Sequence, residues 1–197
     1  MIFASVEEEK ALVAALREGT ETGKRACYEQ FYRYLTAVCE RYISSDDDVK
    51  DLIQDIFIKI FTRFDSFVYR GSGSLQAWCY QIAANEALMF LRRRKHRRNI
   101  PVDSFESADN SEDYPEDPPI DDIPQGVLLE MIRQLPERYR TVFNLYIFEG
   151  KSHREIASIL HIKEDSSASN LHRAKVLLAK WIADYQKTKK NGRQVEK

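Results

Sequence analysis

Apolar residues recur at intervals of three and four along most of this chain, the spacing that places them on one face of an α-helix. In the first hundred residues the pattern predicts four main helices, over Glu7–Glu18, Lys24–Ile43, Asp47–Phe64 and Leu75–Arg94. The consecutive aspartates that open the third helix suit a helix N-terminus electrostatically. Runs that alternate apolar and polar residues are few, and the chain has only seven glycines. The pattern therefore predicts an all-α fold.

A further pair of shorter helices is predicted after residue 150. Ser152 and Glu155 have the spacing of a capping box, in which the side chain of each residue accepts a hydrogen bond from the backbone N–H of the other. An apolar stripe follows, made of Ile156, Ala157, Ile159 and Leu160. His161–Glu164 can form the turn, and Asp165 or Ser166 can cap the second helix. This order predicts a helix-turn-helix, whose second helix enters the major groove of DNA, with an ordinary helical hairpin as the alternative interpretation.

The second helix of this pair has two chemically different faces. Its inward face is predicted to carry Ala168, Leu171, Ala174, Leu178 and Ile182. Its outward face is predicted to carry hydroxyl, amide, imidazole and cationic groups, from Ser167, Ser169, Asn170, His172, Arg173 and Lys175. With Ser152, His153 and Ser166, these outward residues are the candidates for contact with duplex DNA.

The third predicted helix has a wide apolar band, formed by Leu52, Ile53, Ile56, Phe57, Ile60 and Phe61. Polar residues lie across from it: Asp51, Gln54, Asp55 and Lys59. One interpretation is a core helix with a solvated face. The other is that the band is shared between the core and a helix of a partner protein, with the polar edge fixing the register.

The fourth predicted helix and the loop before it, Phe67–Ser74, form a second nucleic-acid candidate. Aromatic residues gather there near Arg70, namely Phe67, Tyr69, Trp78 and Tyr80. Rings can stack on single-stranded bases while cations bind phosphates, and a loop with Gly71 and Gly73 can shape a pocket for an unpaired base. The run Arg92–Arg98, with six cations in seven positions, predicts salt-sensitive binding to a polyanion. In the alternative interpretation, Trp78 and Tyr80 belong to the core.

The formal net charge of −1 over 197 residues conceals blocks of opposite sign. Residues 99–123 hold nine Asp or Glu and no Lys or Arg, whereas the segments on either side carry a net positive charge. Prolines among these acids predict an extended or disordered linker. We therefore expect two small helical domains, 1–98 and 125–190, joined by an acidic flexible linker, 99–124, and followed by a disordered tail, 191–197.

Several classes of protein are disfavoured. No apolar run approaches the roughly 20 residues that span a bilayer, and the acidic N-terminus (Glu7–Glu9) does not suit a signal peptide. The cysteines, Cys27, Cys39 and Cys79, form no CxxC pair and fit reduced thiols of a cytoplasmic protein. The histidines, His96, His153, His161 and His172, lack metal-ligand spacing, and no catalytic constellation is present. We expect no enzyme activity, no cofactor, no metal and no direct membrane insertion.

Three stretches together resemble a known family. They are DLIQDIFIKIFTRFDSF, GSLQAWCYQIAANEALMFLRRRK, and LPERYRTVFNLYIFEGKSHREIASILHI followed by NLHRAK. In this order and spacing around an acidic linker, they resemble the extracytoplasmic-function (ECF) sigma factors of bacterial RNA polymerase, over about Glu8 to Tyr185. The resemblance implies a subunit that binds core polymerase, recognises promoter DNA and helps to start transcription in response to an envelope or environmental signal.

The resemblance also assigns roles to individual residues. The clamp helices of the largest polymerase subunit would be bound by Asp51, Leu52, Gln54, Asp55 and Phe57. The opened non-template strand of the downstream promoter element would be held by Tyr69, Arg70, Asn85, Arg92 and Arg93. The helix from Ser166 would read the upstream duplex element. The linker would thread toward the polymerase active centre, with a simple tether between the domains as the alternative. The polymerase flap and an anti-sigma factor, often membrane-anchored, are the other implied partners.

The sequence departs from the family at the start of the recognition helix. The family often has a Ser-x-Gly-Thr-Val-Lys run there, whereas this chain has Lys163–Ala168, so that Lys163 replaces the usual capping serine. The departure predicts a later start of the helix, together with either weaker contact with phosphates or a different sequence preference. Two rival functions stay open on sequence alone: a stand-alone helix-turn-helix regulator that binds operators as a dimer, and an enzyme acting on nucleic acid.

Overall fold

The computed structural model describes residues 3–97, 119–120 and 122–195, with side chains described as far as Arg94 in the first stretch and Lys189 in the last. The chain forms two compact units, Met1–Pro101 and Val102–Lys197. All regular structure in the described residues is helical, which confirms the predicted fold class. Most of the predicted linker, 99–124, lies outside the described residues, as do Arg98 and the side chains of residues 95–97 in the basic run.

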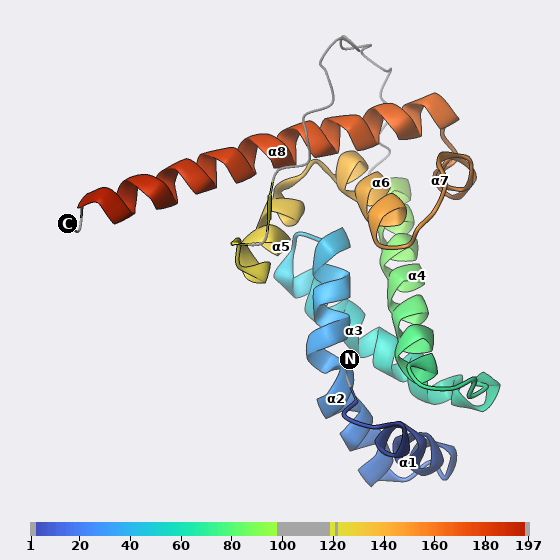
Figure 1. Cartoon of the computed structure of the whole chain (residues 1–197). Helices are drawn as coiled ribbons and strands as arrows, with labels where there is room; N and C mark the ends of the chain where they lie inside the picture. Colours follow the sequence, from blue (N-terminus) through green and yellow to red (C-terminus); the bar gives the residue numbers. More distant parts are fainter. Residues whose placement is uncertain (1–2, 98–118, 121, 196–197) are drawn as a thin grey trace. The chain divides into compact units, whose positions relative to one another are not determined.

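The first unit is built from α1 (Val6–Arg17), α2 (Glu21–Tyr42), α3 (Asp46–Thr62), a short 3-10 helix η1 (Phe64–Ser66) and α4 (Ser74–Arg97). Helices α2, α3 and α4 pack against one another, and α1 packs on α2 (Figure 1). These elements match the four helices predicted from apolar spacing, with boundaries that differ by at most three residues.

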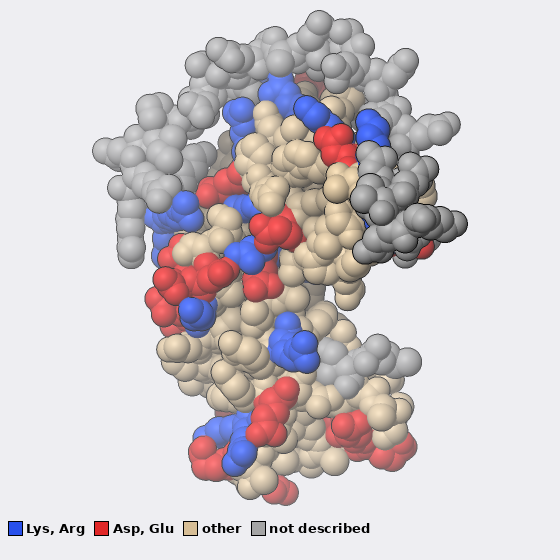
Figure 2. All heavy atoms as spheres, turned by 90° about the vertical axis from the view of Figure 1, so that its left-hand side faces the viewer, with Lys and Arg blue, Asp and Glu red and all other residues tan. Residues whose placement is uncertain are grey.

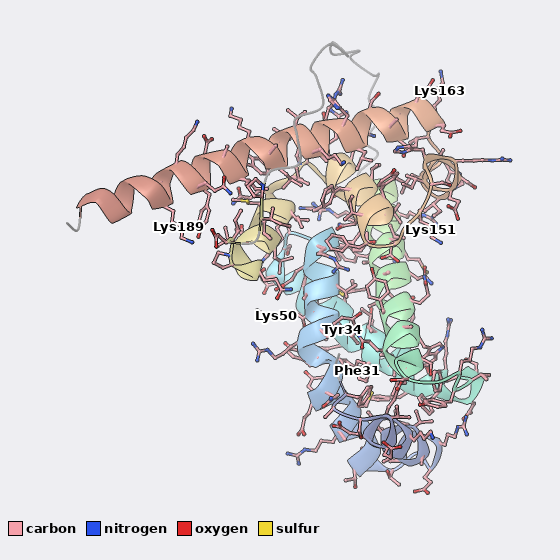
Figure 3. All side chains as sticks on the ribbon, viewed as in Figure 1. Phe31, Tyr34, Lys50, Lys151, Lys163 and Lys189 are labelled. Carbon is pink, nitrogen blue, oxygen red and sulfur yellow. The ribbon has the colours of Figure 1, made fainter. Side chains whose placement is uncertain are left out.

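Helix α2 supplies the centre of the first core. Its residues Phe31, Leu35, Val38 and Tyr42 follow helical spacing and are buried. Phe31 and the half-buried Tyr34 are labelled in Figure 3, and the Tyr34 ring centroid lies 6.3 Å from that of Tyr80 on α4. Burial of large apolar side chains of this kind is the main stabilising contribution to such a unit.

Side-chain caps define where three of the first unit's helices begin. The hydroxyls of Ser5, Thr20 and Ser45 accept hydrogen bonds from backbone N–H groups in the first turns of α1, α2 and α3. At α3 the three aspartates of the first turn add negative charge next to the positive end of the helix dipole. The sequence prediction for this helix start is confirmed.

The second unit contains α5 (Gln125–Gln134), α6 (Glu137–Ile147), α7 (His153–Leu160) and α8 (Glu164–Val195). The long helix α8 packs against α5, α6 and α7 (Figure 1). Half-buried Tyr139 and Phe143 of α6 pack against a core that joins α5 to α8 and is made of Ile123, Met131, Ile132, Leu135, Ala174, Leu178 and Ile182. The buried Arg140 on α6 donates a hydrogen bond to the carbonyl of Arg133 and ties α6 to α5.

Two predictions about α8 are wrong. The helix continues to Val195, so residues 191–195 of the expected disordered tail are helical, while Glu196 and Lys197 lie outside the described residues. The helix also begins at Glu164, not later, although Lys163 replaces the expected capping serine. The acids Glu164 and Asp165 in its first turn stabilise this start through the helix dipole. Of the helices in the described part of the chain, none combines the length and apolar character needed to cross a membrane.

Candidate protein and nucleic-acid interfaces

The candidate partner-binding face of α3 is narrower than the sequence suggests. Asp51, Gln54 and Asp55 are exposed. Leu52 and Phe57, however, retain only 2% and 4% of their surface because they pack in the core of the first unit. The structure therefore contradicts direct contact of Leu52 and Phe57 with a partner: they hold α3 in place, and the three polar residues remain as candidates.

An apolar residue that sequence reasoning missed completes this face. Ile58 is 58% exposed and lies one turn beyond Gln54 and Asp55, on the polar side of α3. Its position i+7 from Asp51 was the available signal, because an apolar residue on a polar face has no core to fill. We define the α3 face as Asp51, Gln54, Asp55 and Ile58.

Lys59, which the sequence placed on the polar edge of α3, turns instead toward α4. Its ammonium forms an ion pair with the carboxylate of Glu86, whose side chain is almost fully buried. The pair joins α3 to α4 inside the first unit. A buried carboxylate without its partner would be costly, so Lys59 has a structural role and does not belong to the α3 face.

The aromatic residues around the loop before α4 are mostly structural. Phe67 is buried, and its ring centroid lies 5.3 Å from that of Trp78 and 5.4 Å from that of Phe64. Tyr80 accepts a hydrogen bond from the Arg41 guanidinium, at 3.2 Å. The interpretation of Trp78 and Tyr80 as core residues is thus supported for both side chains, which pack against the first core.

The loop itself carries the remaining candidates. Arg70 is exposed and Tyr69 half-buried, while Gly71 and Gly73 have φ values of +117° and +80°. Burial, followed by the negative charges of Glu9 and Glu7, raises the pKa of Tyr69. The Tyr69 hydroxyl oxygen is itself buried and has no hydrogen-bond partner among the described residues, so the ring of Tyr69, and not its hydroxyl, is the candidate for contact with a base.

A buried carboxylate holds the end of this loop. Glu9 on α1 is fully buried, and its two oxygens accept hydrogen bonds from the backbone N–H groups of Gly73, at 2.7 Å, and Leu75, at 2.8 Å. Sequence reasoning treated Glu9 only as part of an acidic N-terminus. The available signal was its spacing, because Glu9 shares one helix face with the buried Leu12, Val13 and Leu16.

Further along α4, Asn85, Arg92 and Arg93 are exposed as predicted. Asn85 accepts a hydrogen bond from Gln81, at 3.2 Å, and Met89 on the same side of the helix is 43% exposed. Asn85, Met89 and Arg92 are spaced four and three residues apart, so they form one continuous strip on α4. The strip combines a polar, an apolar and a cationic side chain, which suits contact with a base and its phosphate.

The helix-turn-helix is present in the second unit. The Ser152 hydroxyl accepts from the Glu155 N–H, at 3.3 Å, and the Glu155 carboxylate accepts from the Ser152 N–H, at 2.8 Å, which confirms the predicted capping box. The Ser152 hydroxyl also donates to the Glu155 carboxylate, at 2.8 Å. The hydrogen bonds that this carboxylate accepts from the N–H and the hydroxyl of Ser152 lower the pKa of Glu155. The turn also falls where predicted, since His161 adopts a left-handed φ of 55° and α8 follows from Glu164.

The predicted inward face of α8 is largely confirmed, because Leu171, Ala174, Leu178 and Ile182 are all buried, although Ala168 is only half-buried. The predicted outward face needs correction. Ser167 is fully buried, and Ser166 and Asn170 are also buried. The reason is geometric: residues 167, 170, 171, 174 and 178 form one stripe at helical spacing, and that stripe continues the inward face into the first turns.

Ser167 and His153 have a joint role inside the second unit. The His153 Nδ1 lies 3.0 Å from the Ser167 Oγ, and the imidazole stacks on the Tyr146 ring, with centroids 4.9 Å apart. The contact links α6, α7 and α8. Ser152 stays exposed, but its hydroxyl and N–H are engaged in the capping box.

On α8, four of the predicted DNA-contacting residues remain partly accessible: Ser169, His172, Arg173 and Lys175. The Arg173 guanidinium donates to the Tyr139 hydroxyl on α6, at 3.4 Å. Burial raises the pKa of Tyr139, but hydrogen bonds from Arg173 and Arg138 outweigh it and lower that pKa overall. Arg173 is thus held against α6, which limits the positions its guanidinium can reach.

Charged side chains are dispersed on the surface. Figure 2 shows a face on which Lys and Arg side chains are interspersed with Asp and Glu side chains and with broad uncharged areas. In the described residues, no group of three or more His, Cys, Asp and Glu side chains is arranged to hold a metal ion. Burial raises the pKa of the free thiols of Cys27 and Cys39 to about 12, which disfavours the reactive thiolate form.

Comparison with known proteins identifies the class. Residues 27–97 match the family model for sigma-70 region 2, and residues 125–178 match that for sigma-70 region 4. The chain is 26% identical over 178 residues to the ECF RNA polymerase sigma-E factor of Haemophilus influenzae, covering 86% of this chain and 93% of that protein. It is 27% identical over 185 residues to the RNA polymerase sigma-H factor of Pseudomonas aeruginosa, covering 88% and 93%.

Two solved structures are also similar. One is CnrH in complex with the cytosolic domain of CnrY, at 18% identity and a TM-score of 0.45, covering 88% of this chain and 96% of CnrH. The other is the sigma factor RpoE in complex with the anti-sigma factor NepR from Bartonella quintana, at 21% identity and a TM-score of 0.45, covering 81% and 96%.

The chain belongs to the ECF sigma factors, non-enzymatic subunits that direct RNA polymerase to promoters and start transcription. The match to region 2 excludes the rival interpretation of a stand-alone helix-turn-helix regulator, because such a regulator requires only the second unit.

Proposed function

We propose that this sigma factor divides promoter recognition among three described surfaces. The α3 face binds core polymerase, the loop and strip of α4 hold the opened strand, and the α7–α8 end of the second unit reads the upstream duplex. The observation that carries the proposal is the α3 face itself. An isoleucine that is 58% exposed among polar residues of α3 suits contact with a partner, and polymerase is the partner that the family defines.

The α3 face suits a helical partner. Ile58 offers an apolar anchor, while Asp51, Gln54 and Asp55 surround it with groups that accept hydrogen bonds and attract cations. Central apolar anchors with a polar rim are typical of interface hot spots. The clamp helices of the largest polymerase subunit are the proposed partner, and the polymerase flap is the proposed partner of the second unit.

The opened strand is proposed to lie along the strip formed by Asn85, Met89 and Arg92, with Arg93 beside it. Tyr69 and Arg70 extend this surface into the loop. Arg92 and Arg93 supply charge for phosphates, and Tyr69 supplies a ring for stacking. The remaining cations of the basic run Arg92–Arg98, which follow in the sequence, are proposed to add to the phosphate contacts.

Upstream duplex recognition is proposed to use the corrected face of the second unit. Ser169, His172, Arg173 and Lys175 remain accessible there. Lys151 before α7 and Lys163 before α8 are labelled in Figure 3 and lie at opposite ends of α7, where both can bind phosphate. Glu164 and Asp165 stabilise the helix but repel phosphates, so we propose weaker backbone contact at this end than a cationic start would give.

Regulation and location follow from the family. We propose that the chain acts in the cytoplasm, where polymerase transcribes, and that an anti-sigma factor, membrane-anchored in the simplest case, withholds it until an envelope or environmental signal arrives. The acidic linker is proposed to thread toward the polymerase active centre.

Run-off transcription with core polymerase across genomic fragments tests the function as a whole. Fragments that carry the promoter should yield transcripts with the sigma factor and none without it. Transcripts from no fragment, with a folded protein bound to core polymerase, would contradict the proposed promoter-directing role.

A further inference from the structure

The carboxylate of Glu9 is buried against the end of the loop that precedes α4. It lies outside the segment that matches sigma-70 region 2, which begins at Cys27. We propose that Glu9 is a positioning residue for strand capture: its carboxylate holds the Phe67–Ser74 loop in the shape that receives a base of the opened strand. The inference rests on the proposed function of that loop.

The hydrogen bonds made by Glu9 meet a specific need of α4. Backbone N–H groups at a helix start have no partner within the helix, and the first turn of α4 contains no acidic residue. The Glu9 oxygens accept from Gly73 N–H and Leu75 N–H at 2.7 and 2.8 Å. Hydrogen bonds to a charged acceptor are stronger than neutral ones, and the negative charge also complements the helix dipole.

The loop needs such an anchor because of its backbone. Gly71 and Gly73 both have positive φ values, yet a Cβ at either position would meet nothing within 4 Å. The space at both positions is therefore open to a Cβ, and the positive φ values are the reason that glycine suits them. Within the loop, Arg70 N–H donates to the Ser74 Oγ, at 3.3 Å. Two backbone hydrogen bonds also stabilise this turn: Ser74 N–H donates to the Gly71 carbonyl, at 3.1 Å, and Ala77 N–H donates to the Gly73 carbonyl, at 2.9 Å. The Glu9 bonds are the ones that tie the end of the loop to α1.

The charge of Glu9 also acts on a proposed strand-binding side chain. After burial, the negative charge of Glu9 is the next cause that raises the pKa of Tyr69. One carboxylate thus holds the backbone where the loop ends and acts electrostatically on the residue whose ring would stack on a base. A change at Glu9 should move the ring, the loop backbone and the start of α4 together.

The neighbouring acids provide matched controls. Glu7 and Glu8 are exposed, and Glu8 accepts from the N–H of Ala4, at 2.8 Å, on the same helix end. In the described residues the hydrogen bonds that tie the end of the loop to α1 are those that Glu9 accepts. Glu7→Gln therefore removes a charge that also acts on Tyr69 but leaves these hydrogen bonds in place, and Glu9→Asp keeps the charge but shortens its reach.

The test uses the full chain assembled with core polymerase. The probe is a fluorescent single-stranded oligonucleotide of the non-template strand across the downstream promoter element, together with versions that carry an abasic site at each position in turn. Loss of one stacked base should weaken binding of the wild-type holoenzyme by about tenfold at the captured position. The measured quantity is the ratio of the affinity for the intact strand to the affinity for the abasic strand. We expect Glu7→Gln to keep the wild-type ratio, Glu9→Gln to reduce it to about twofold or less, and Glu9→Asp to give an intermediate ratio.

The outcomes separate this inference from the function on which it rests. If the wild-type holoenzyme is insensitive to every abasic site, the loop does not capture a base, and the proposed role of the loop fails along with this inference. If the wild type is sensitive and Glu9→Gln is equally sensitive, the loop role stands and the Glu9 inference is overturned. Should Glu9→Gln fail to fold, Glu9→Asp decides: an unchanged ratio there contradicts the proposal. A purely structural loss would weaken binding to intact and abasic strands alike.

Discussion

In the helix-turn-helix, the imidazole of His153 on α7 and the hydroxyl of Ser167 on α8 lie 3.0 Å apart. Ser167 is fully buried. The contact links the two helices of the motif inside the second unit. Ser167 therefore serves the architecture of the duplex-reading unit, although its place in the sequence suggests direct contact with DNA.

Replacing Ser167 with alanine should lower the free energy of unfolding by about 1 kcal/mol, because a buried hydrogen bond is lost and one ring nitrogen of His153 is left without that partner. Urea denaturation monitored by circular dichroism measures the change. Ser169→Ala, at a partly accessible position of the same helix, should change stability by less than about 0.5 kcal/mol. Unchanged stability of Ser167→Ala, with reduced affinity for promoter duplex, would show that Ser167 contacts DNA after all.

Variants of α3 should separate partner binding from folding. Asp51→Arg and Ile58→Ala should each weaken core polymerase binding by about tenfold while leaving the unfolding free energy nearly unchanged, since both side chains are exposed. Leu52→Ala should instead destabilise the fold by about 2–5 kcal/mol, because it leaves a cavity in the core. Affinity is measured by titrating labelled sigma factor with core polymerase. Glu18→Arg is the charge-reversal control, because Glu18 is exposed at the end of α1. Normal polymerase binding by folded Asp51→Arg and Ile58→Ala would contradict the proposal that the α3 face binds polymerase.

The double variant Arg92→Ala/Arg93→Ala should impair promoter opening more than upstream duplex binding. Two lost phosphate contacts should reduce the salt slope of single-strand binding by about 1.4. A fluorescent base analogue in the downstream element reports opening, and a mobility shift with duplex DNA reports binding. The double variant Arg17→Ala/Arg33→Ala, which removes two exposed cations from α1 and α2, should leave both assays unchanged. Equal losses in both assays for the Arg92/Arg93 variant would refute the division of labour.

The capping box predicts a pH dependence. The pKa of Glu155 in the folded protein is lowered below its ordinary value of 4.5. A depressed folded-state pKa contributes stability that is fully present above the unfolded-state pKa and is lost as the pH falls through the folded-state value. The melting temperature of the wild type should therefore exceed that of Glu155→Gln at pH 7, and the difference should shrink as the pH falls below 4.5. A difference that stays constant from pH 7 to pH 3 would show that the carboxylate charge contributes nothing to the cap.

Local chemistry made much of this protein predictable. Apolar spacing predicted the helices of the first unit, and the Ser152–Glu155 box and the turn near His161 predicted the helix-turn-helix. These features depend on contacts within a few residues, such as caps, dipoles and periodicity, which any reader of the sequence can evaluate. The motif order around the linker then indicated the sigma factor family.

Contacts between distant segments decided the rest. Leu52 and Phe57 lie in the core because α2 and α4 cover that side of α3, and Ser167 is buried because α6 and α7 pack on the first turns of α8. Glu9 reaches Gly73 and Leu75 across more than sixty positions of sequence. A sequence pattern can assign a residue to a face of its helix, but only tertiary packing determines whether solvent, a core or a loop backbone meets that face.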